Sequence, residues 1–205
     1  IQILTILGFD VNALIAGAGV VGIAVSLGAQ STLSNLIAGV ALVIERPFGI
    51  GDWIVLGSFE GTVEDISFRS TRIRALDNSV ITVENSKVSA EYICNTTTRS
   101  NRLFSCTVGL TYDTPRETLE QLCADLVAMM NADDQVIDGS AEATLSAFNA
   151  SSIDIDVRCY TTALGGAAFR ALKDKLNRKI MDLVAQDGCD FAFPSTTVYL
   201  EKNDP

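Results

Sequence analysis

The amino-acid sequence predicts a membrane protein in which an α-helical membrane segment is followed by a small all-β domain of the Sm-like kind and an α+β C-terminal domain. Residues 11–44 carry no charged side chain, and such a long uncharged apolar run is a candidate for spanning a membrane. Short strand patterns separated by turns begin after Phe48, and two amphipathic helix patterns then alternate with further strands. We therefore expect three parts: residues 1–45, residues 46–100 and residues 101–205.

The apolar run is too long for one straight membrane-spanning helix. Residues 11–44 would extend over about 50 Å as a helix, against about 30 Å of hydrocarbon. We expect a break at the polar cluster Gln30-Ser31-Thr32, which continues with Ser34-Asn35. The piece after the break has its own apolar stripe and can lie along the membrane interface, and Glu45, Arg46 and Pro47 end it.

The run has no basic n-region and is too long to be a secretory signal. Ile1–Leu7 is also apolar, and Gly8 and Asp10 mark a turn after it. We expect Ile1–Leu7 to be the end of an earlier hydrophobic segment, with further membrane helices upstream in the native polypeptide.

The part of the run before the break is rich in small residues. Ala18, Gly22 and Ser26 recur at i, i+4 spacing, which lets membrane helices approach closely. The larger Ile23 and Leu27 share another face. If copies of the helix surround an axis, these two side chains would form apolar rings that exclude water from a narrow pore. Their spacing equally allows both to pack against a neighbouring helix.

The residues after Phe48 predict a small twisted sheet or partial barrel. Arg69, Arg72 and Arg74 alternate with apolar positions there, and Asp and Glu are equally dense nearby. This pattern favours a solvated strand face over an RNA-binding platform. The expected strands cover residues 53–56, 62–68, 71–74 and 80–83.

The last part predicts alternating strands and helices. We expect helices over residues 115–130 and 167–185, whereas residues 141–149 fit either a strand or a helix. Asp113 or Thr114 can cap the first helix, Pro115 suits its first position, and Gly188 lies near the end of the second. The expected strands cover residues 104–110, 152–160 and 196–200.

Composition and charge exclude several classes of protein. Hydrophobic residues make up 48% of the 205 residues and charged residues only 20%, whereas a disordered chain needs low hydrophobicity and high charge. The net charge of −10 argues against a nucleic-acid partner, because affinity for phosphates comes mostly from Lys and Arg. The absence of histidine rules out His-ligated zinc and Ser–His–Asp or Cys–His catalysis within the chain.

Nothing in the sequence indicates a metal, a cofactor or catalytic residues. Asp154 and Asp156 alternate on the outward face of a strand, which favours a solvated surface over an acid–base pair. No two cysteines form a Cys-x-x-Cys motif, and their odd number favours free, buried thiols in a reducing compartment. The five cysteines are Cys94, Cys106, Cys123, Cys159 and Cys189.

Several of these segments resemble one protein family. The stretch GVVGIAVSLGAQSTLSNLIAGVALVIERPFGIGDWI (Gly19–Ile54) is similar to the pore helix and β-domain entry of the small-conductance mechanosensitive channel (MscS) family. Its best markers are Gln30, the LSNLIAG block (Leu33–Gly39) and RPFGIGD (Arg46–Asp52). The stretch EGTVEDISFRSTRIRALDNSVITVENSKV (Glu60–Val88) resembles the β-domain of the same family, and a weaker likeness continues through the α+β part.

The resemblance implies a heptameric channel of the bacterial inner membrane that opens under bilayer tension and releases ions and small osmolytes on hypo-osmotic shock. It implies several membrane spans in the native protein, with the C-terminal part forming a cytoplasmic vestibule with side portals and, from Thr196–Leu200, a small β-barrel. The two pore-closing apolar rings of the family fall on Ile23 and Leu27. The helix-packing positions of the family fall on Ala16, Gly19, Val20, Gly22, Ala24 and Ser26.

The resemblance also implies a kinked pore helix, with the kink at Gln30, Ser31 and Gly39. Ser31 stands where the family usually has a glycine, and Gly39 supplies the second kink glycine. Val20 replaces an expected Ala and Ser26 an expected Gly. These differences bear on how easily the helix straightens or slides.

Two other kinds of protein remain as alternatives. One is a membrane-tethered, ring-forming Sm-like or OB-like module that binds oligonucleotides and has no channel activity; acidic charge and the lack of aromatic side chains beside Lys and Arg argue against it. The other is a membrane-tethered enzyme, against which the lack of histidine and of a glycine-rich phosphate loop argues.

Overall fold

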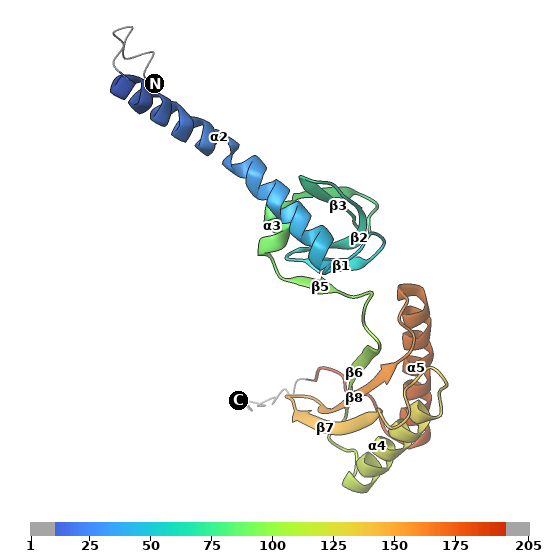
Figure 1. The fold of residues 1–205 in the computed structure, drawn as a ribbon. Coiled ribbons are helices and arrows are strands. Elements are labelled where there is room, and N and C mark those ends of the chain that lie inside the picture. Colours follow the sequence, from blue (N-terminus) through green and yellow to red (C-terminus); the bar gives the residue numbers. More distant parts are fainter. Residues whose placement is uncertain (1–10, 196–205) are drawn as a thin grey trace, which may run out of the picture. The chain divides into compact units, whose positions relative to one another are not determined.

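The computed structural model describes residues 11–195 and divides the chain into two compact units, with the division between Thr98 and Arg99. The first unit contains a long helix and an all-β domain, and the second is an α+β domain (Figure 1). The predicted fold class is therefore confirmed. The predictions for Ile1–Leu7 and for a strand at Thr196–Leu200 lie outside the described residues.

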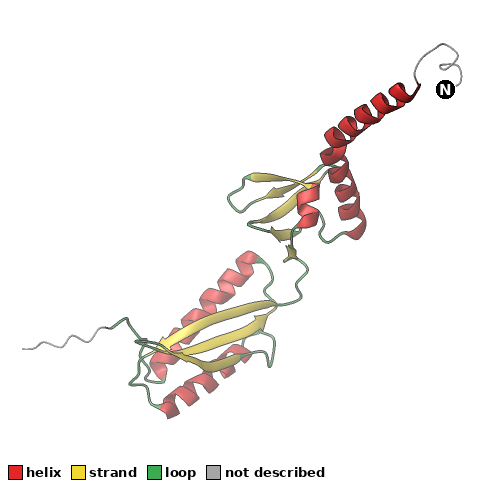
Figure 2. Ribbon diagram, turned by 90° about the vertical axis from the view of Figure 1, so that its left-hand side faces the viewer, coloured by secondary structure: helices red, strands yellow, loops and turns green. Residues whose placement is uncertain are grey.

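The apolar run forms one long helix, α2 (Val11–Glu45). Its helical structure is continuous through Gln30, Ser31 and Thr32, so the expected break does not interrupt the helix. The ribbon of α2 nevertheless bends part-way along its length (Figure 2). The two observations agree, since a helix can kink and remain helical. Arg46 follows the helix with a positive φ of 48°, and Pro47 cannot continue it.

Five antiparallel strands of the first unit form a sheet with the order β4-β3-β2-β1-β5. A short helix, α3 (Asn85–Ala90), connects its last two strands. Leu42 of α2 and Val88 of α3 are buried with Ile54, Val63 and Ile73 of the sheet, so both helices complete its core. The strands are β1 (Trp53–Leu56), β2 (Phe59–Ile66), β3 (Ser70–Arg74), β4 (Val80–Glu84) and β5 (Ile93–Asn95).

The arginines of β3 lie on a solvated face, as predicted. Arg72 forms an ion pair with Asp65 at 3.2 Å, and Arg74 forms an ion pair with Glu64. These ion pairs engage both guanidinium groups with carboxylates of the neighbouring strand β2.

Helix α3 and strand β5 were not expected from the sequence. Both are short, and a helix of this length is not stable by propensity alone. Glu84, the N-cap residue of α3, makes no side-chain capping hydrogen bond. Contacts with the rest of the first unit therefore hold these two elements in place.

The second unit is a three-stranded antiparallel sheet covered on one face by two helices (Figure 2). Alternate residues of its central strand are buried, including Ile155, Val157 and Cys159. Leu126 and Leu176 represent the apolar stripes of the two helices in this core. The elements are β6 (Arg102–Leu110), α4 (Arg116–Asn131), β7 (Glu142–Phe148), β8 (Ile153–Thr161) and α5 (Gly166–Gln186), with the strand order β6-β8-β7.

A buried ion cluster ties the end of α4 to α5. The Asp133 side chain has no exposed surface, and it accepts hydrogen bonds from Lys175 Nζ at 2.7 Å and Lys179 Nζ at 3.2 Å. Burial alone would raise the pKa of Asp133. The hydrogen bonds from the two lysines and from the Gln135 main chain, together with the charge of Lys175, outweigh burial and hold this pKa below its ordinary value.

Three local predictions need correction or completion. Residues 142–148 form a strand, which settles the ambiguous segment. Pro115 is the N-cap residue of α4 rather than its first helical residue, because its ψ of 149° is extended. Neither Asp113 nor Thr114 caps the helix with a side chain. Gly188 has the positive φ of 72° that suits the residue after a helix.

The cysteines are free, but they are not all buried. Cys159 and Cys189 are buried, Cys106 and Cys123 are half-buried, and Cys94 is exposed. Cys94 lies on the short edge strand β5, which has a neighbour on one side only. Burial raises the pKa of the Cys159 thiol to about 11.

Candidate functional site

Residues 15–34, the upper part of α2, form a long, exposed and mostly apolar surface. Every residue from 15 to 34 is exposed, including Ile23 (64%) and Leu27 (68%). Within the described residues, α2 alone, over Ile15–Glu45, is long and apolar enough to cross a membrane. A buried core helix of a water-soluble domain would not leave such a surface uncovered.

The predicted gate and packing residues all lie on this exposed part of α2. Ile23 and Leu27 are one helical turn apart, and neither is covered by another element. A Cβ atom built on Gly19 or Gly22 would meet nothing within 4 Å. The space beside these small residues is therefore open to a neighbouring helix. The remaining predicted packing residues, also exposed, are Ala16, Val20, Ala24 and Ser26.

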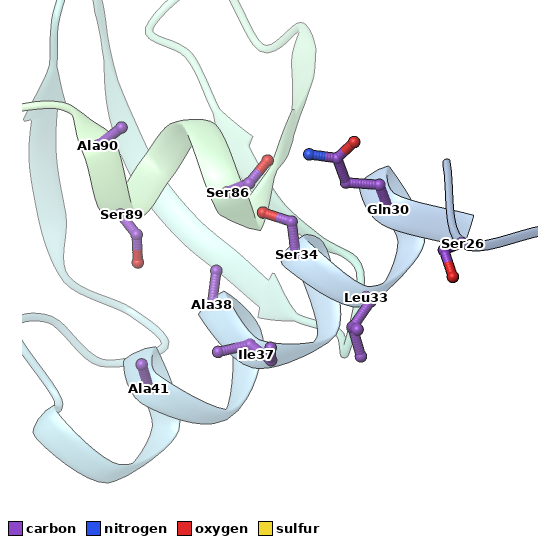
Figure 3. Close-up of a pocket in the computed structure, with 10 residues that line it drawn as sticks. All are labelled: Ser26, Gln30, Leu33, Ser34, Ile37, Ala38, Ala41, Ser86, Ser89 and Ala90. Carbon is purple, nitrogen blue, oxygen red and sulfur yellow. The ribbon is translucent and has the colours of Figure 1, made fainter. Parts of the chain in front are cut away.

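Further along, α2 packs against α3, and a groove of about 630 Å³ opens between them (Figure 3). Ser34 and Gln30 of α2 point toward the side of α3 that carries Ser86 (Figure 3). The groove is lined by small and hydroxyl-bearing side chains together with a few apolar ones. They are Ser26, Gln30, Leu33, Ser34, Ile37, Ala38, Ala41, Ser86, Ser89 and Ala90.

One hydrogen bond of the Asn35 side chain joins α2 to α3, and a second lies within α2. Asn35 is only 1% exposed. The main-chain N–H of Ser86 donates to Asn35 Oδ1 at 3.0 Å, and Asn35 Nδ2 donates to the Ser31 carbonyl at 3.0 Å. Because Glu84 provides no side-chain cap, Asn35 of α2 satisfies a first-turn N–H of α3 from outside that helix.

Gly39 lies against the β domain. A Cβ atom built on it would lie 2.6 Å from Asn85 Nδ2 and 2.7 Å from the Phe68 carbonyl oxygen. Asn85 is itself buried: it accepts from Thr71 Oγ1 at 2.9 Å and donates to the Ser67 carbonyl at 2.8 Å. Only glycine permits this close approach of α2 to the β2–β3 turn.

The outward carboxylates of β8 are engaged in local hydrogen bonds. Asp156 Oδ1 accepts from Thr107 Oγ1 at 3.0 Å, and Asp154 accepts from Asn149 Nδ2 at 2.6 Å and from Ser152 Oγ at 2.7 Å. In the part of the chain that the structure describes, no group of three or more His, Cys, Asp or Glu residues is placed to hold a metal ion.

Comparison with known proteins decides the family. Residues 1–30 match the family description "Mechanosensitive ion channel, transmembrane helices 2/3", residues 31–98 match "Mechanosensitive ion channel, beta-domain", and residues 104–191 match "Mechanosensitive ion channel MscS, C-terminal". The chain belongs to the MscS family of mechanosensitive ion channels. The three matched segments follow one another along almost the whole chain.

Named members of the MscS family are similar over the same length. The chain is 37% identical to the large-conductance mechanosensitive channel MscMJLR of Methanocaldococcus jannaschii, over 98% of this chain and 57% of that protein. It is 34% identical to the small-conductance mechanosensitive channel MscMJ of the same organism, with the same coverage. The chain thus spans little more than half the length of these curated relatives.

Solved structures of MscS proteins share the fold. The closed-state crystal structure of Helicobacter pylori MscS matches with a TM-score of 0.85 at 23% identity, over 98% of this chain and 78% of that one. The cryo-EM structure of Arabidopsis thaliana MSL1 matches with a TM-score of 0.85 at 21% identity, over 94% of this chain and 69% of that one.

The sequence pattern placed Asn35 in the polar cluster of the expected break, but it predicted no contact for Asn35 and did not single out Asn85. The signal was present in part, because Asn35 is a polar residue in an uncharged apolar run, and a polar group in such a place needs a hydrogen-bond partner. Its partner is a main-chain N–H of Ser86, fifty-one residues away in sequence, and nothing local in the sequence identifies such a partner.

Proposed function

We propose that the complete protein is an ion channel opened by membrane tension, which releases ions and small osmolytes on hypo-osmotic shock. The exposed, uncharged surface of α2 carries this proposal, in a chain of the MscS family. Such a surface is stable only in lipid or against other helices. The relatives MscMJLR and MscMJ are themselves named mechanosensitive channels, which supports the same activity here.

The proposed assembly is a homo-oligomer of seven copies, the number that the resemblance to the family implies. Within residues 11–195, no other part of the chain comes within 4 Å of a Cβ atom built on Gly19 or Gly22. We therefore propose that a second copy or an upstream helix packs closely at these positions. Membrane lipids would surround the assembly. We propose a multi-pass protein of the bacterial inner membrane whose C-terminal domain is cytoplasmic.

Ile23 and Leu27 form the proposed gate. Arranged around a symmetry axis, their side chains would make two apolar rings that keep a narrow constriction dry in the closed state. Tension favours the state that occupies more membrane area, so it shifts a two-state population as a ligand does. The helices would then slide over the small faces of Ala16, Gly19, Val20, Gly22, Ala24 and Ser26.

The helix bend is the second moving part of the proposal. Gln30 and Ser31 would form the flexible point above the segment that Asn35 ties to α3. Gly39 would then serve the close contact with the β domain as well as the second kink. In this arrangement the upper part of α2 moves while its lower part stays with the β domain.

Membrane patches containing the full-length purified protein test the proposal. Suction on the patch should evoke stepwise currents in liposomes that contain the protein and none in empty liposomes. Mass measurement in detergent should give a large homo-oligomer. A monomer that passes no current at tensions close to patch rupture would contradict the proposal. Salt-dependent retention of RNA by such a protein would instead favour the ring-forming binding module.

A further inference from the structure

Two arginine side chains, Arg102 and Arg170, lie near the N-terminal end of α5. Arg102, at the start of β6, places its guanidinium carbon 3.9 Å from the centre of the Phe169 ring. Its Nη1 donates to the Leu164 carbonyl at 3.3 Å. Arg170 folds back along the helix, so that its Nη1 lies 3.6 Å from the position of a Cβ atom built on Gly166. Leu164 and Gly166 flank Gly165, the N-cap residue of α5, so both guanidinium groups lie near the start of this helix.

Acidic side chains do not balance these charges. Within residues 11–195, neither Arg102 nor Arg170 forms an ion pair with Asp or Glu. The first turn of α5 contains no acidic residue, and its N-cap residue is Gly165, which offers no side-chain acceptor. Local positive charge therefore accumulates here in a chain whose net charge is −10.

The environment of Arg102 reflects this accumulation. Burial lowers the pKa of its guanidinium group, and the nearby charges of Arg99 and Arg170 lower it further. An anion bound between the guanidinium groups would relieve this repulsion. Stacking on Phe169 and the hydrogen bond to Leu164 hold the Arg102 guanidinium in place without an anion, so little side-chain freedom would be lost on binding.

We propose that the guanidinium groups of Arg102 and Arg170 bind a phosphate-type oxyanion at this end of α5. Each guanidinium offers a planar fork of N–H donors that fits phosphate oxygens in pairs. The main-chain N–H groups at the start of α5 would add to the attraction. A phosphate has more acceptor oxygens than a carboxylate and so uses both forks and the main chain. Free phosphate and the phosphate of a nucleotide present the same group.

Isothermal titration calorimetry of the detergent-solubilised full-length protein tests this site, with chloride holding the ionic strength constant. Inorganic phosphate and adenosine monophosphate are titrated separately, which distinguishes a free phosphate from the phosphate of a larger molecule. We expect saturable binding of at least one, weakened about tenfold or more in Arg170→Gln. Arg102→Gln should weaken it similarly, and Arg102→Lys less, because lysine keeps the charge but loses the fork.

Arg178→Gln is the matched control, since Arg178 is an exposed residue of the same helix that pairs with Asp174 at 2.9 Å. It removes the same charge away from the proposed site, and binding should stay unchanged. Arg170 is exposed, so its replacement leaves the core of the domain intact. No saturable heat with either anion, or an equal loss of affinity in Arg178→Gln and Arg170→Gln, would overturn the proposal.

Discussion

Replacing Asn35 by alanine tests whether hydrogen bonds fix α2 to the β domain. The substitution removes the Oδ1 acceptor that receives the Ser86 main-chain N–H at 3.0 Å. It also removes the Nδ2 donor to the Ser31 carbonyl. Alanine is a better helix former than asparagine, so α2 itself should persist. What is lost is the attachment between α2 and the first turn of α3.

The expected cost follows from the group that is left without a partner. Loss of a side-chain cap costs about 1 kcal/mol, and leaving a buried N–H without an acceptor costs about 1–3 kcal/mol. Ser86 is only half-buried, so water can replace part of the lost bond. We expect a loss of about 1–2 kcal/mol, which corresponds to roughly a 5- to 30-fold change in the equilibrium between attached and detached α3.

Amide hydrogen exchange of the detergent-solubilised protein measures this equilibrium locally. Exchange over residues 85–90 should accelerate about 5- to 30-fold in Asn35→Ala. Ser34→Ala is the matched control, because Ser34 is the preceding residue and is exposed. In this variant, exchange over residues 85–90 should equal that of the wild type. Unchanged exchange in Asn35→Ala, or equal acceleration in both variants, would refute this account of the α2–α3 contact.

Three further predictions concern packing, pH and thiols. Gly39→Ala should lower the melting temperature in a thermal scan despite its gain in helix propensity, because the new methyl group would meet Asn85 at 2.6 Å; an unchanged or higher value would count against the close contact. Asp133, whose pKa is lowered in the folded state, should stabilise the domain fully above about pH 4, and this stabilisation should fade as pH falls through the folded-state value. Asp133→Asn should therefore destabilise the protein at pH 7 and flatten the acid side of a plot of melting temperature against pH. An unaltered plot would show that the ion cluster does not cause the loss of stability at acid pH. At neutral pH, iodoacetamide should label exposed Cys94 long before buried Cys159, as peptide mass spectrometry would report, and the reverse order would contradict the burial of Cys159.

Long-range patterns in the sequence predicted most of the fold. The uncharged run of residues 11–44 predicted α2, because so many consecutive apolar residues avoid water only in lipid or in a protein core. Strict alternation in β8 predicted its one buried face, with Ile155 and Val157 inward. Helix α3 and strand β5 were missed because they are too short for a period to show. Distant contacts decide their structure: α2 contacts α3 through Asn35, and β5 pairs with β1.

The candidate site divides in the same way. Ile23 and Leu27 could be placed on one exposed helical face from spacing alone. Gly39 could be noticed as a glycine, but its contact with Asn85 depends on how the chain folds back. Spacing along one helix shows which residues share a face, whereas the partner across a contact is set by the fold of the whole unit.

Patch recordings of Leu27→Ser beside Val25→Ser test the central claim most directly. The two wild-type side chains are equally exposed in the single chain, at 68% and 65%, but they point to different sides of α2. If Leu27 lines a water-excluding constriction, Leu27→Ser should open at clearly lower tension than the wild type, because a hydroxyl group wets the ring. Val25→Ser should keep a threshold close to that of the wild type. An unaltered threshold in Leu27→Ser, or the same shift in both variants, would contradict the account.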